Sequence, residues 1–315
     1  MEPPINNRQL LYFVKVVEAG SLTAAADQLR IAQPALGLQI RNLEEDLGVA
    51  LIVRHSRGIE PTAAGALLFE RSRAILQAME DVQQEIKNFA GGMQEAIRFG
   101  ITPSAMRLLG PDLLLEARQM MPDVFFSLVE ELSFSLVATL EAGDLDAAFT
   151  YQNTDRNRIT GRPIMEEDLL LISSPELDDS SEPVSFTEAA RRDLVLAGPR
   201  DVIRRLAEET AERLSVPLNV IYEAQSVPAT RNLIEKGLAS GIMPYGSVVG
   251  ELDSGTLCAR PIIEPELIRT LYFVRRARVT PLQSERAFAL FVERAIETLT
   301  ERLGEHCRPL GRPRR

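Results

Sequence analysis

The side chains best suited to a chemical task lie in one short segment, residues 33–42. Amide and basic residues share one face of the helix that this segment predicts: Gln33, Gln39, Arg41 and Asn42. Amide groups both donate and accept hydrogen bonds, as base edges in a nucleic-acid groove require, and arginine pairs with phosphate. On the opposite face, apolar residues recur at intervals of four and three: Leu36, Ile40, Leu43 and Leu47. That spacing indicates an α-helix with one buried stripe, which presents the polar side chains outward.

A shorter helix is expected just upstream, from Thr23 to Leu29. It is rich in alanine, and Ala25 and Ala26 fall on the same face as Leu29. Pro34 fits the first turn of the following helix, where its missing N–H breaks no hydrogen bond. Two helices with a short turn between them are typical of a helix-turn-helix, whose second helix enters the major groove of DNA. The alternative is a pair of ordinary amphipathic helices in an α-rich domain.

The flanking segments favour the DNA-binding interpretation. Residues 8–19 predict a helix closed by a glycine. Residues 49–62 predict two short strands joined by a cationic turn that includes Arg54 and Arg57. Such a ribbon is a wing, whose arginines can reach phosphates or a narrow minor groove. Three helices followed by a wing predict a winged helix-turn-helix over residues 1–65.

With these elements in place, the chain resembles the LysR-type transcriptional regulators. The resemblance rests on motifs in the family's order and spacing: Tyr12-Phe13-Val14, Gly20-Ser21-Leu22-Thr23-Ala24-Ala25-Ala26, Gln33-Pro34-Ala35-Leu36, Gln39-Ile40, Leu43-Glu44, Leu47-Gly48, Arg54, Arg57-Gly58 and Thr62-Ala63-Ala64-Gly65. Residues 31–48 and the Ile59-Glu60-Pro61-Thr62 after the wing most resemble the nitrogen-assimilation-control branch of the family. The resemblance implies a sequence-specific transcriptional regulator that binds promoter DNA.

We expect one set of residues to contact double-stranded DNA: Thr23, Gln33, Pro34, Ala35, Gly37, Leu38, Gln39, Arg41, Arg54 and Arg57. The chain departs from the family close to this set. Ala32 and Gly37 stand where the family usually has serine, and the missing hydroxyl at Ala32 removes an expected N-cap. Leu38 stands where arginine is common, and it can touch a thymine methyl group instead of a phosphate. The base preference of relatives therefore does not transfer to this chain.

The length of 315 residues allows two or three domains with cores of their own. The polar N-terminus shows no secretory signal, and no apolar run approaches a membrane span. Two cysteines in unrelated contexts, Cys258 and Cys307, do not imply a disulfide, so we expect a reduced, cytoplasmic protein. The net charge of −10 argues against a general nucleic-acid binder, and the first 60 residues hold six basic against seven acidic side chains. DNA binding must then rely on a few well-placed cations, supplied by several copies of the chain.

A long helix is expected from Thr62 to about Phe89. Its apolar residues step by seven, four, three, four and three: Leu68, Ile75, Met79, Val82, Ile86 and Phe89. That is a heptad seam with a polar gap at Ser72. We interpret residues 62–90 as a linker helix that pairs copies of the chain into a homodimer or homotetramer. The alternative is a helix packed on its own domain.

Residues 93–303 alternate strand-like and helix-like segments. Strands are expected at 97–102, 124–130 and 145–151, and helices at 107–120, 133–142, 201–214, 228–238 and 282–303. The alternation is typical of an α/β domain with parallel strands. Proline-containing tripeptides at 161–163 and 263–265 indicate two crossings between lobes. Lobe one then takes residues 93–161 and 267–303, and lobe two takes residues 162–266.

This order of elements resembles the effector-binding domain of the same family, which is similar to periplasmic solute-binding proteins. Residues 304–315 are basic and broken by proline and glycine, so they predict a disordered tail.

The resemblance implies a small-molecule effector, whose identity the sequence leaves open. Small ligands of α/β domains bind at the carboxyl ends of strands and at helix N-termini, in the cleft between lobes. Such positions supply nine candidates: Thr102, Ser104, Ser133, Thr150, Pro199, Arg200, Ser226, Val227 and Met243. In relatives, the positions matching Thr102, Ser104, Ser133 and Ser226 line the inducer cleft. Each hydroxyl could instead cap a helix, and Arg200 could pair with a carboxylate ligand or lie on the surface.

The competing interpretation is a small-molecule enzyme or solute-binding protein with structural N-terminal helices. The two histidines, His55 in the wing and His306 near the end, leave no histidine-based triad or histidine-ligated zinc site in the body of the chain. The sequence has no P-loop and no GxGxxG motif after a strand. We therefore expect no catalytic residues, no metal, no cofactor besides the effector, and no association with a membrane.

Overall fold

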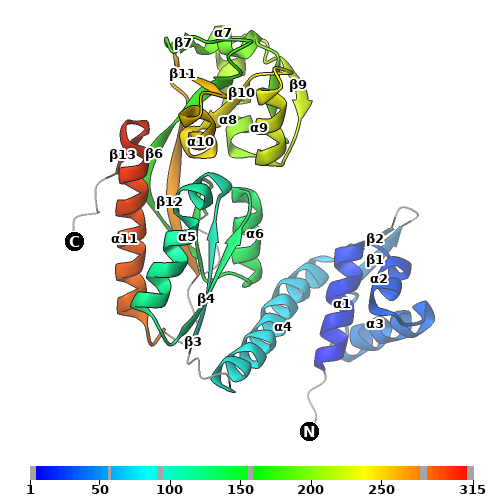
Figure 1. Ribbon diagram of the computed structural model, residues 1–315. Helices are drawn as coiled ribbons and strands as arrows, with labels where there is room; N and C mark the ends of the chain where they lie inside the picture. The colour runs from blue at the N-terminus through cyan, green and yellow to red at the C-terminus, as the bar shows by residue number, and fades with distance from the viewer. Residues whose placement is uncertain (1–4, 56–57, 91–94, 155–158, 277–281, 311–315) are drawn as a thin grey trace. The chain divides into compact units, whose positions relative to one another are not determined.

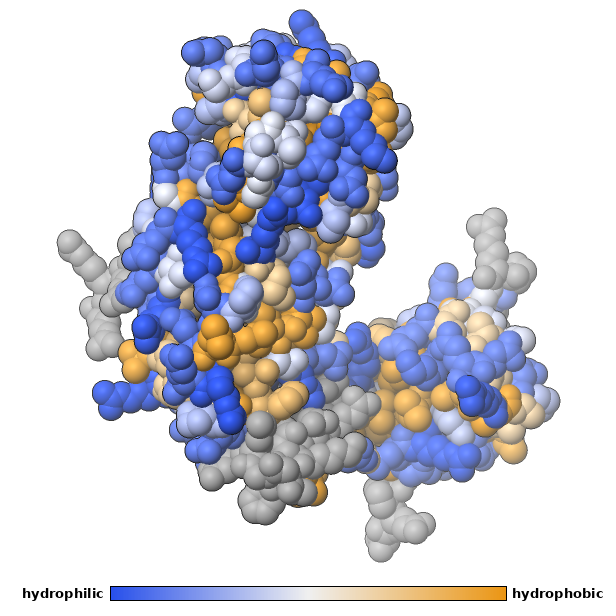
Figure 2. All heavy atoms as spheres, viewed as in Figure 1, coloured by the Kyte–Doolittle hydropathy of each residue, from blue (hydrophilic) through white to orange (hydrophobic). Residues whose placement is uncertain are grey.

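In the computed structural model, the described residues are 5–55, 58–90, 95–154, 159–276 and 282–310. The chain divides into two compact units, Met1–Ala90 and Gly91–Arg315. On the face shown in Figure 2, polar side chains cover most of the surface, with separate apolar patches between them. No helix in the described part of the chain has both the length and the apolarity needed to cross a bilayer.

The described part of unit 1 consists of helices and a two-stranded ribbon (Figure 1). The helices are α1 (Asn7–Ala19), α2 (Leu22–Leu29), α3 (Gln33–Leu47) and α4 (Ala63–Ala90), and the strands are β1 (Ile52–His55) and β2 (Gly58–Pro61). Side chains cap the N-termini of α1 and α2, through Asn6 and Ser21. The N-cap of α3 is Ala32, which makes no side-chain hydrogen bond. The predicted loss of this cap is therefore confirmed, and a proline in the first turn favours the helical start instead.

One apolar core joins the helices and the ribbon of unit 1. Its fully buried side chains come from several elements: Phe13, Val16, Ala25, Leu36, Ile40 and Leu43. Glu44 of α3 ties the ribbon to this core, because its Oε1 accepts hydrogen bonds from the N–H groups of Leu51 and Ile52 at 2.7 and 3.2 Å. Near the start of α4, a Cβ at Gly65 would lie 1.9 Å from the Leu51 carbonyl oxygen, so only glycine fits. These contacts fix the ribbon relative to α3.

Unit 2 contains two α/β lobes. Lobe one contains β3 (Glu95–Ile101), α5 (Pro103–Met120), β4 (Val124–Glu130), α6 (Ser133–Ala142), β5 (Ala147–Thr150), β12 (Ile268–Arg276) and α11 (Glu285–Leu303). Lobe two contains β7 (Val184–Ser185), α7 (Phe186–Arg191), β8 (Leu194–Leu196), α8 (Val202–Leu214), β9 (Val220–Glu223), α9 (Val227–Glu235), β10 (Gly241–Pro244), η1 (Tyr245–Ser247), α10 (Val249–Asp253) and β11 (Cys258–Ile263). β6 (Ile159–Ser173) belongs to both lobes (Figure 1). The strand and helix expected at 124–130 and 133–142 are confirmed, and the other elements differ from expectation mainly at their ends.

The sheet that links the lobes is mixed rather than parallel. β3 pairs in parallel with β4 and β5, as predicted. β12 runs antiparallel to β5 and β6, and β10 and β11 run antiparallel to β6. The prediction of parallel strands was wrong for these pairs because β12 returns to lobe one alongside β6, in the opposite direction.

The first crossing between the lobes lies at Asp168 and Leu169, not at residues 161–162. β6 is unbroken through Pro163, because a bulge opposite the Leu271–Tyr272 step accommodates the proline within the strand. Residues 159–168 pair with β12, whereas Leu169 packs in a core of lobe two. The second crossing lies between residues 267 and 268, since Leu267 packs in a core of lobe two and β12 begins at Ile268.

The prediction of a disordered tail was wrong for residues 304–309. A short 3-10 helix, η2 (Gly304–His306), leads into β13 (Cys307–Pro309), which pairs antiparallel with β6. Arg308 forms ion pairs with Asp168 at 2.7 Å and with Glu266 at 3.2 Å. Pairing with a distant strand orders the segment, which local composition does not reveal. Residues 311–315 of the predicted tail lie outside the described residues.

Candidate functional site

The predicted polar face of α3 is exposed at Gln33 and Arg41 and half-buried at Gln39 and Asn42. The exposed members of the predicted DNA-contact set are Thr23 on α2 and Gln33, Pro34, Ala35, Leu38 and Arg41 on α3, and Gln39 is half-buried. Leu38 is 51% exposed, although it is apolar. An apolar side chain among amides and a guanidinium suits a surface that contacts base methyl groups as well as polar base edges.

Gly37 differs from the other predicted contacts on α3 because it is buried. A Cβ added at this position would meet no atom within 4 Å, so the serine common in the family would fit here. Its burial does not support a direct contact between Gly37 and DNA.

The wing has a fixed base. Arg54 lies in β1 opposite Ile59 of β2. The Ile59 N–H donates to the Gly20 carbonyl oxygen at 2.8 Å, which holds the ribbon against the end of α1. Gly58 has φ +138°, and a Cβ there would lie 2.7 Å from the same oxygen, so the turn requires glycine. Arg57 lies outside the described residues.

α4 exposes an apolar stripe, formed by Ile75, Met79, Val82 and Ile86 of the predicted seam. Val82 is 58% exposed. Closer to the start of the helix, Leu68 packs on the core of unit 1 and Ser72 is fully buried. The side chain of Phe89 lies outside the described residues. The helix therefore packs on its own domain at its beginning and presents uncovered apolar side chains from Ile75 onward.

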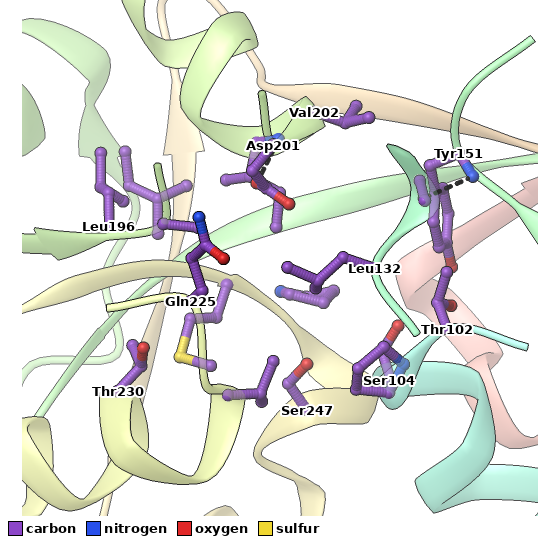
Figure 3. Close-up of a pocket in the computed structure, with 18 of the residues that line it drawn as sticks. Thr102, Ser104, Leu132, Tyr151, Leu196, Asp201, Val202, Gln225, Thr230 and Ser247 are labelled. Carbon is purple, nitrogen blue, oxygen red and sulfur yellow. Dashed lines mark hydrogen bonds between the residues drawn. The ribbon is translucent and has the colours of Figure 1, made fainter. Parts of the chain in front are cut away.

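A pocket lies between the two lobes of unit 2, with a cavity volume of about 70 Å³. It is lined by the first residues of α5, α6, α8 and α9 and by the ends of β8 and β10. Figure 3 shows Thr102, Ser104 and Tyr151 on one side and Leu196 and Gln225 on the other. The lining includes five of the nine predicted ligand residues: Thr102, Ser104, Ser133, Val227 and Met243.

The other four predicted ligand residues are not among the lining residues. Thr150 is fully buried, and its hydroxyl accepts a backbone hydrogen bond within its own loop. The Arg200 guanidinium lies 4.5 Å from the centre of the Phe134 ring. Ser226 caps the N-terminus of α9, and Pro199 is exposed.

A buried ionic network forms one wall of the pocket. Arg269 donates from Nε and Nη2 to the Glu167 Oε2 atom at 2.9 and 2.7 Å, and its Nη2 also donates to the Ser104 hydroxyl at 2.9 Å. Tyr151 donates to the same Glu167 oxygen at 2.5 Å, and its ring centre lies 3.4 Å from the Arg269 guanidinium carbon. Arg269 is 7% exposed and Glu167 is 1% exposed. Each buried charge therefore has an opposite charge and hydrogen bonds, which offset its desolvation.

The pKa values of Tyr151 and Arg269 are raised within this network. Burial raises the pKa of Tyr151, and the neighbouring Glu167 carboxylate raises it further, against an opposing effect of Arg269. Burial acts to lower the pKa of Arg269, but Glu167, together with Tyr151 and Asp201, outweighs burial and raises that pKa. Arg269 thus stays charged and Tyr151 stays protonated at neutral pH.

Sequence reasoning missed Arg269, Glu167 and Asp201. Glu167 and Arg269 are 102 positions apart, and only the register of β6 and β12 brings them together. The available signal was a single arginine at the start of an apolar strand-like run. For Asp201, the signal was an aspartate at the first position of a predicted helix, because aspartate is a common N-cap.

The histidine and cysteine side chains of the chain do not line the pocket. His55 belongs to the wing, and the His306 ring stacks on Tyr245 with 4.4 Å between ring centres. Both cysteine thiols are free, and neither lines the pocket. Within the described ranges, no cluster of three or more histidine, cysteine, aspartate or glutamate side chains could hold a metal ion.

Two family models match the chain. The model described as bacterial regulatory helix-turn-helix protein, lysR family, matches residues 7–66. The model described as LysR substrate binding domain matches residues 90–297. The first match lies within unit 1, and the second covers both lobes of unit 2.

Relatives and solved structures match most of the chain. It is 29% identical to the HTH-type transcriptional regulator BbuR of Bordetella bronchiseptica, over 94% of this chain and 91% of the relative. It is 33% identical to the nitrogen assimilation regulatory protein nac of Klebsiella aerogenes, over 76% of this chain and 78% of the relative. The structure of full-length CbnR complexed with its target DNA is similar in fold, with a TM-score of 0.60 at 24% identity over 93% of this chain and 100% of that chain.

Proposed function

The chain belongs to the LysR family of bacterial regulatory helix-turn-helix proteins, and from this membership we propose how its two units act. Unit 1 binds promoter DNA in a sequence-dependent way, and unit 2 responds to a small molecule bound between its lobes. The protein is thus a DNA-binding transcriptional regulator with an effector-binding domain. Because its partner is DNA, we place it in the cytoplasm.

The exposed face of α3 carries the DNA-binding proposal. Gln33 and Arg41 lie on this face, while Leu36, Ile40 and Leu43 on the other face are fully buried in the core of unit 1. α3 can therefore enter a major groove without uncovering apolar side chains of the core. The backbone of the wing is fixed to the same core, because Glu44 of α3 and the Gly20 carbonyl oxygen both accept hydrogen bonds from it.

The apolar stripe of α4 supports pairing of two copies. Four exposed apolar side chains at heptad spacing are costly to leave in water, and a second copy of the same helix covers them. Pairing also suits the charge of the DNA-binding unit, because two copies double the few cations that each one carries. We propose a homodimer as the minimal DNA-binding species, with the homotetramer as a pair of dimers.

The pocket between the lobes supports the sensing role. A ligand that contacts α5 or α6 of lobe one and α8 or α9 of lobe two favours one angle between the lobes over others. Such differential binding is what couples an effector to a distant site. We assign the pocket to sensing because it lies within the residues that the LysR substrate binding domain model matches.

Fluorescence anisotropy with the full-length protein tests the proposed function. The probe is the DNA upstream of the protein's own coding region, and the control is a scrambled duplex of equal length and composition, both in low salt. We expect tighter binding to the upstream fragment, because base-edge contacts by α3 add to phosphate contacts. Equal affinity for the two duplexes would contradict a sequence-specific regulator.

A further inference from the structure

The helix N-termini at the pocket are capped unequally. The N-caps of α5 and α6 in lobe one are Thr102 and Leu132, and neither makes a side-chain hydrogen bond. α8 and α9 of lobe two are capped, by Asp201 and Ser226. An uncapped N-terminus leaves backbone N–H groups free and carries about half a positive charge. The lobe-one side of the pocket therefore offers two sites of positive potential with unused donors.

The Thr102 side chain is a second, independent indication that lobe one binds a ligand. Its side chain is 3% exposed and lines the pocket, and within the described residues its Oγ1 has no hydrogen-bond partner. A buried hydroxyl without a partner costs free energy that a ligand atom can recover. Thr102 can donate to an acceptor that also faces the free amides of α5.

The opposite side of the pocket carries a negative charge. Asp201 lines it, and its Oδ1 atom accepts hydrogen bonds from the N–H groups of Ile203 and Arg204 at 2.9 and 3.3 Å. Gln225, whose side-chain oxygen can accept a further hydrogen bond, lies on the same side (Figure 3). This side therefore suits a cationic group that donates hydrogen bonds.

Arg269 does not reverse this charge pattern, although it is the cation among the lining residues. The Glu167 carboxylate neutralises its charge, with 2.7 Å between the Arg269 Nη2 and Glu167 Oε2 atoms. Arg200 lies over the Phe134 ring and is not among the lining residues. A ligand carrying only negative charge would meet helix N-termini on one side but the Asp201 carboxylate on the other.

The size of the pocket limits the ligand further. At roughly 10–15 Å³ for each water-sized group, the 70 Å³ cavity holds about five to seven such groups. Between the polar ends, apolar side chains such as Leu196, Val202 and Met243 line the space. The ligand is therefore small, with a short apolar part and one charge of each sign.

Building on the effector-binding function above, we propose that the effector is a small α-amino acid. Its carboxylate lies at the N-termini of α5 and α6, where the Thr102 hydroxyl donates to it. Its ammonium group lies against the Asp201 carboxylate. Asp201 thus determines specificity, because it separates amino acids from acids that lack the amine.

Isothermal titration of the full-length protein tests the charge pattern with matched probes. L-Alanine carries both charged groups, propanoate lacks the ammonium, and ethylamine lacks the carboxylate. L-Serine and L-valine extend the panel in size. We expect an amino acid of this panel to bind at least about tenfold more tightly than propanoate or ethylamine, since a hydrogen bond to a charged group contributes this much or more.

The Asp201→Asn variant tests the specificity residue. Asparagine keeps the N-cap of α8 and removes the charge. We expect amino-acid affinity to fall about 10- to 100-fold, to the level of propanoate. Asp253→Asn, on an exposed turn of α10 in the same lobe, is the matched control and should bind as the wild type does.

Three results would overturn the proposal: propanoate binding as tightly as the amino acid, unchanged amino-acid affinity in Asp201→Asn, or no binding by any amino acid of the panel. The anisotropy assay on the same preparations separates these outcomes from failure of the proposed function. If the protein still prefers its upstream DNA, the regulator stands and only the identity of the effector is wrong.

Discussion

Arg269 and Glu167 face each other across the antiparallel strands β12 and β6, with 2.7 Å between the Arg269 Nη2 and Glu167 Oε2 atoms. Both are almost completely buried. β6 crosses between the lobes next to Glu167, and β12 begins at the second crossing, so the pair lies close to both crossings as well as at the pocket. Removing one partner leaves a buried charge unpaired.

The Glu167→Gln variant should lower the free energy of unfolding by about 3 kcal/mol or more, because Arg269 stays charged without its counter-ion. Urea unfolding followed by circular dichroism measures this change. Glu166→Gln, one position along the strand, has a less buried side chain and should change stability by less than about 0.5 kcal/mol. Equal stability of the two variants would show that the pair is not essential to the fold.

Tyr151 should make stability fall as the pH rises above its ordinary pKa of about 10. Its pKa is raised in the folded state, so above pH 10 the folded chain holds a proton that the unfolded chain has released. The contribution of Tyr151 to the free energy of unfolding is fully present below pH 10. Above pH 10 this contribution decreases by up to about 1.4 kcal/mol per pH unit.

Thermal melting between pH 9 and 11 checks this dependence. Tyr151→Phe removes the titrating group, so its melting temperature should decline less steeply than that of the wild type. Tyr222→Phe, at a residue that is 42% exposed, should decline as the wild type does. If the melting temperatures of the wild type and Tyr151→Phe declined equally with pH, the pKa of Tyr151 would not be raised in the folded state.

The Arg54→Ala variant should weaken binding to all DNA sequences alike. A lost phosphate contact releases one counter-ion fewer, so the log–log salt slope should decrease by about one unit. Anisotropy titrations from low to physiological salt measure that slope. Lys15→Ala removes a cation that pairs with Glu18 at 2.7 Å and should leave the slope unchanged. An unchanged slope in Arg54→Ala would rule out the phosphate contact.

The Gln33→Ala variant should weaken binding to the preferred DNA by about 1–3 kcal/mol and leave binding to scrambled DNA unchanged. Gln33 lies exposed at the start of α3, where helix residues reach base edges. Competition titrations with both duplexes measure the difference, and Gln119→Ala on α5 is the control. A loss of equal size on both duplexes would mean that Gln33 does not read bases.

The Val82→Glu variant should dissociate the homodimer, because a charge within an apolar helix interface is desolvated without a partner. We expect the dimer dissociation constant to rise at least about 100-fold. Sedimentation equilibrium measures it. Gln83→Glu introduces the same charge one position away, off the stripe, and should leave the dimer intact. If both variants remain dimers, the stripe of α4 is not the interface.

The sequence predicted unit 1 well because its signals are local. The buried stripe Leu36, Ile40 and Leu43 follows from helical period alone, and the missing cap at Ala32 follows from one residue type. Thr102, Ser104 and Ser133 could be predicted as pocket residues because each follows the carboxyl end of a predicted strand.

The features of unit 2 that the sequence did not predict depend on pairing between segments far apart in the chain. The Arg269–Glu167 pair and the strand at residues 307–309 depend on the register of β6 with distant segments, which local periodicity does not encode. Arg200 has the same residue type as a carboxylate-binding arginine, but its side chain stacks on Phe134. Its direction depends on a neighbour from another lobe, so residue type alone could not show it.

Hydroxyl-radical footprinting of the full-length protein on its upstream DNA tests the central claim most directly, because it reports which grooves α3 occupies. We predict two discrete protected half-sites related by a two-fold axis, with centres separated by about 10–10.5 base pairs or a multiple of that distance. Uniform protection, or the same pattern on scrambled DNA, would contradict a paired helix-turn-helix that reads sequence.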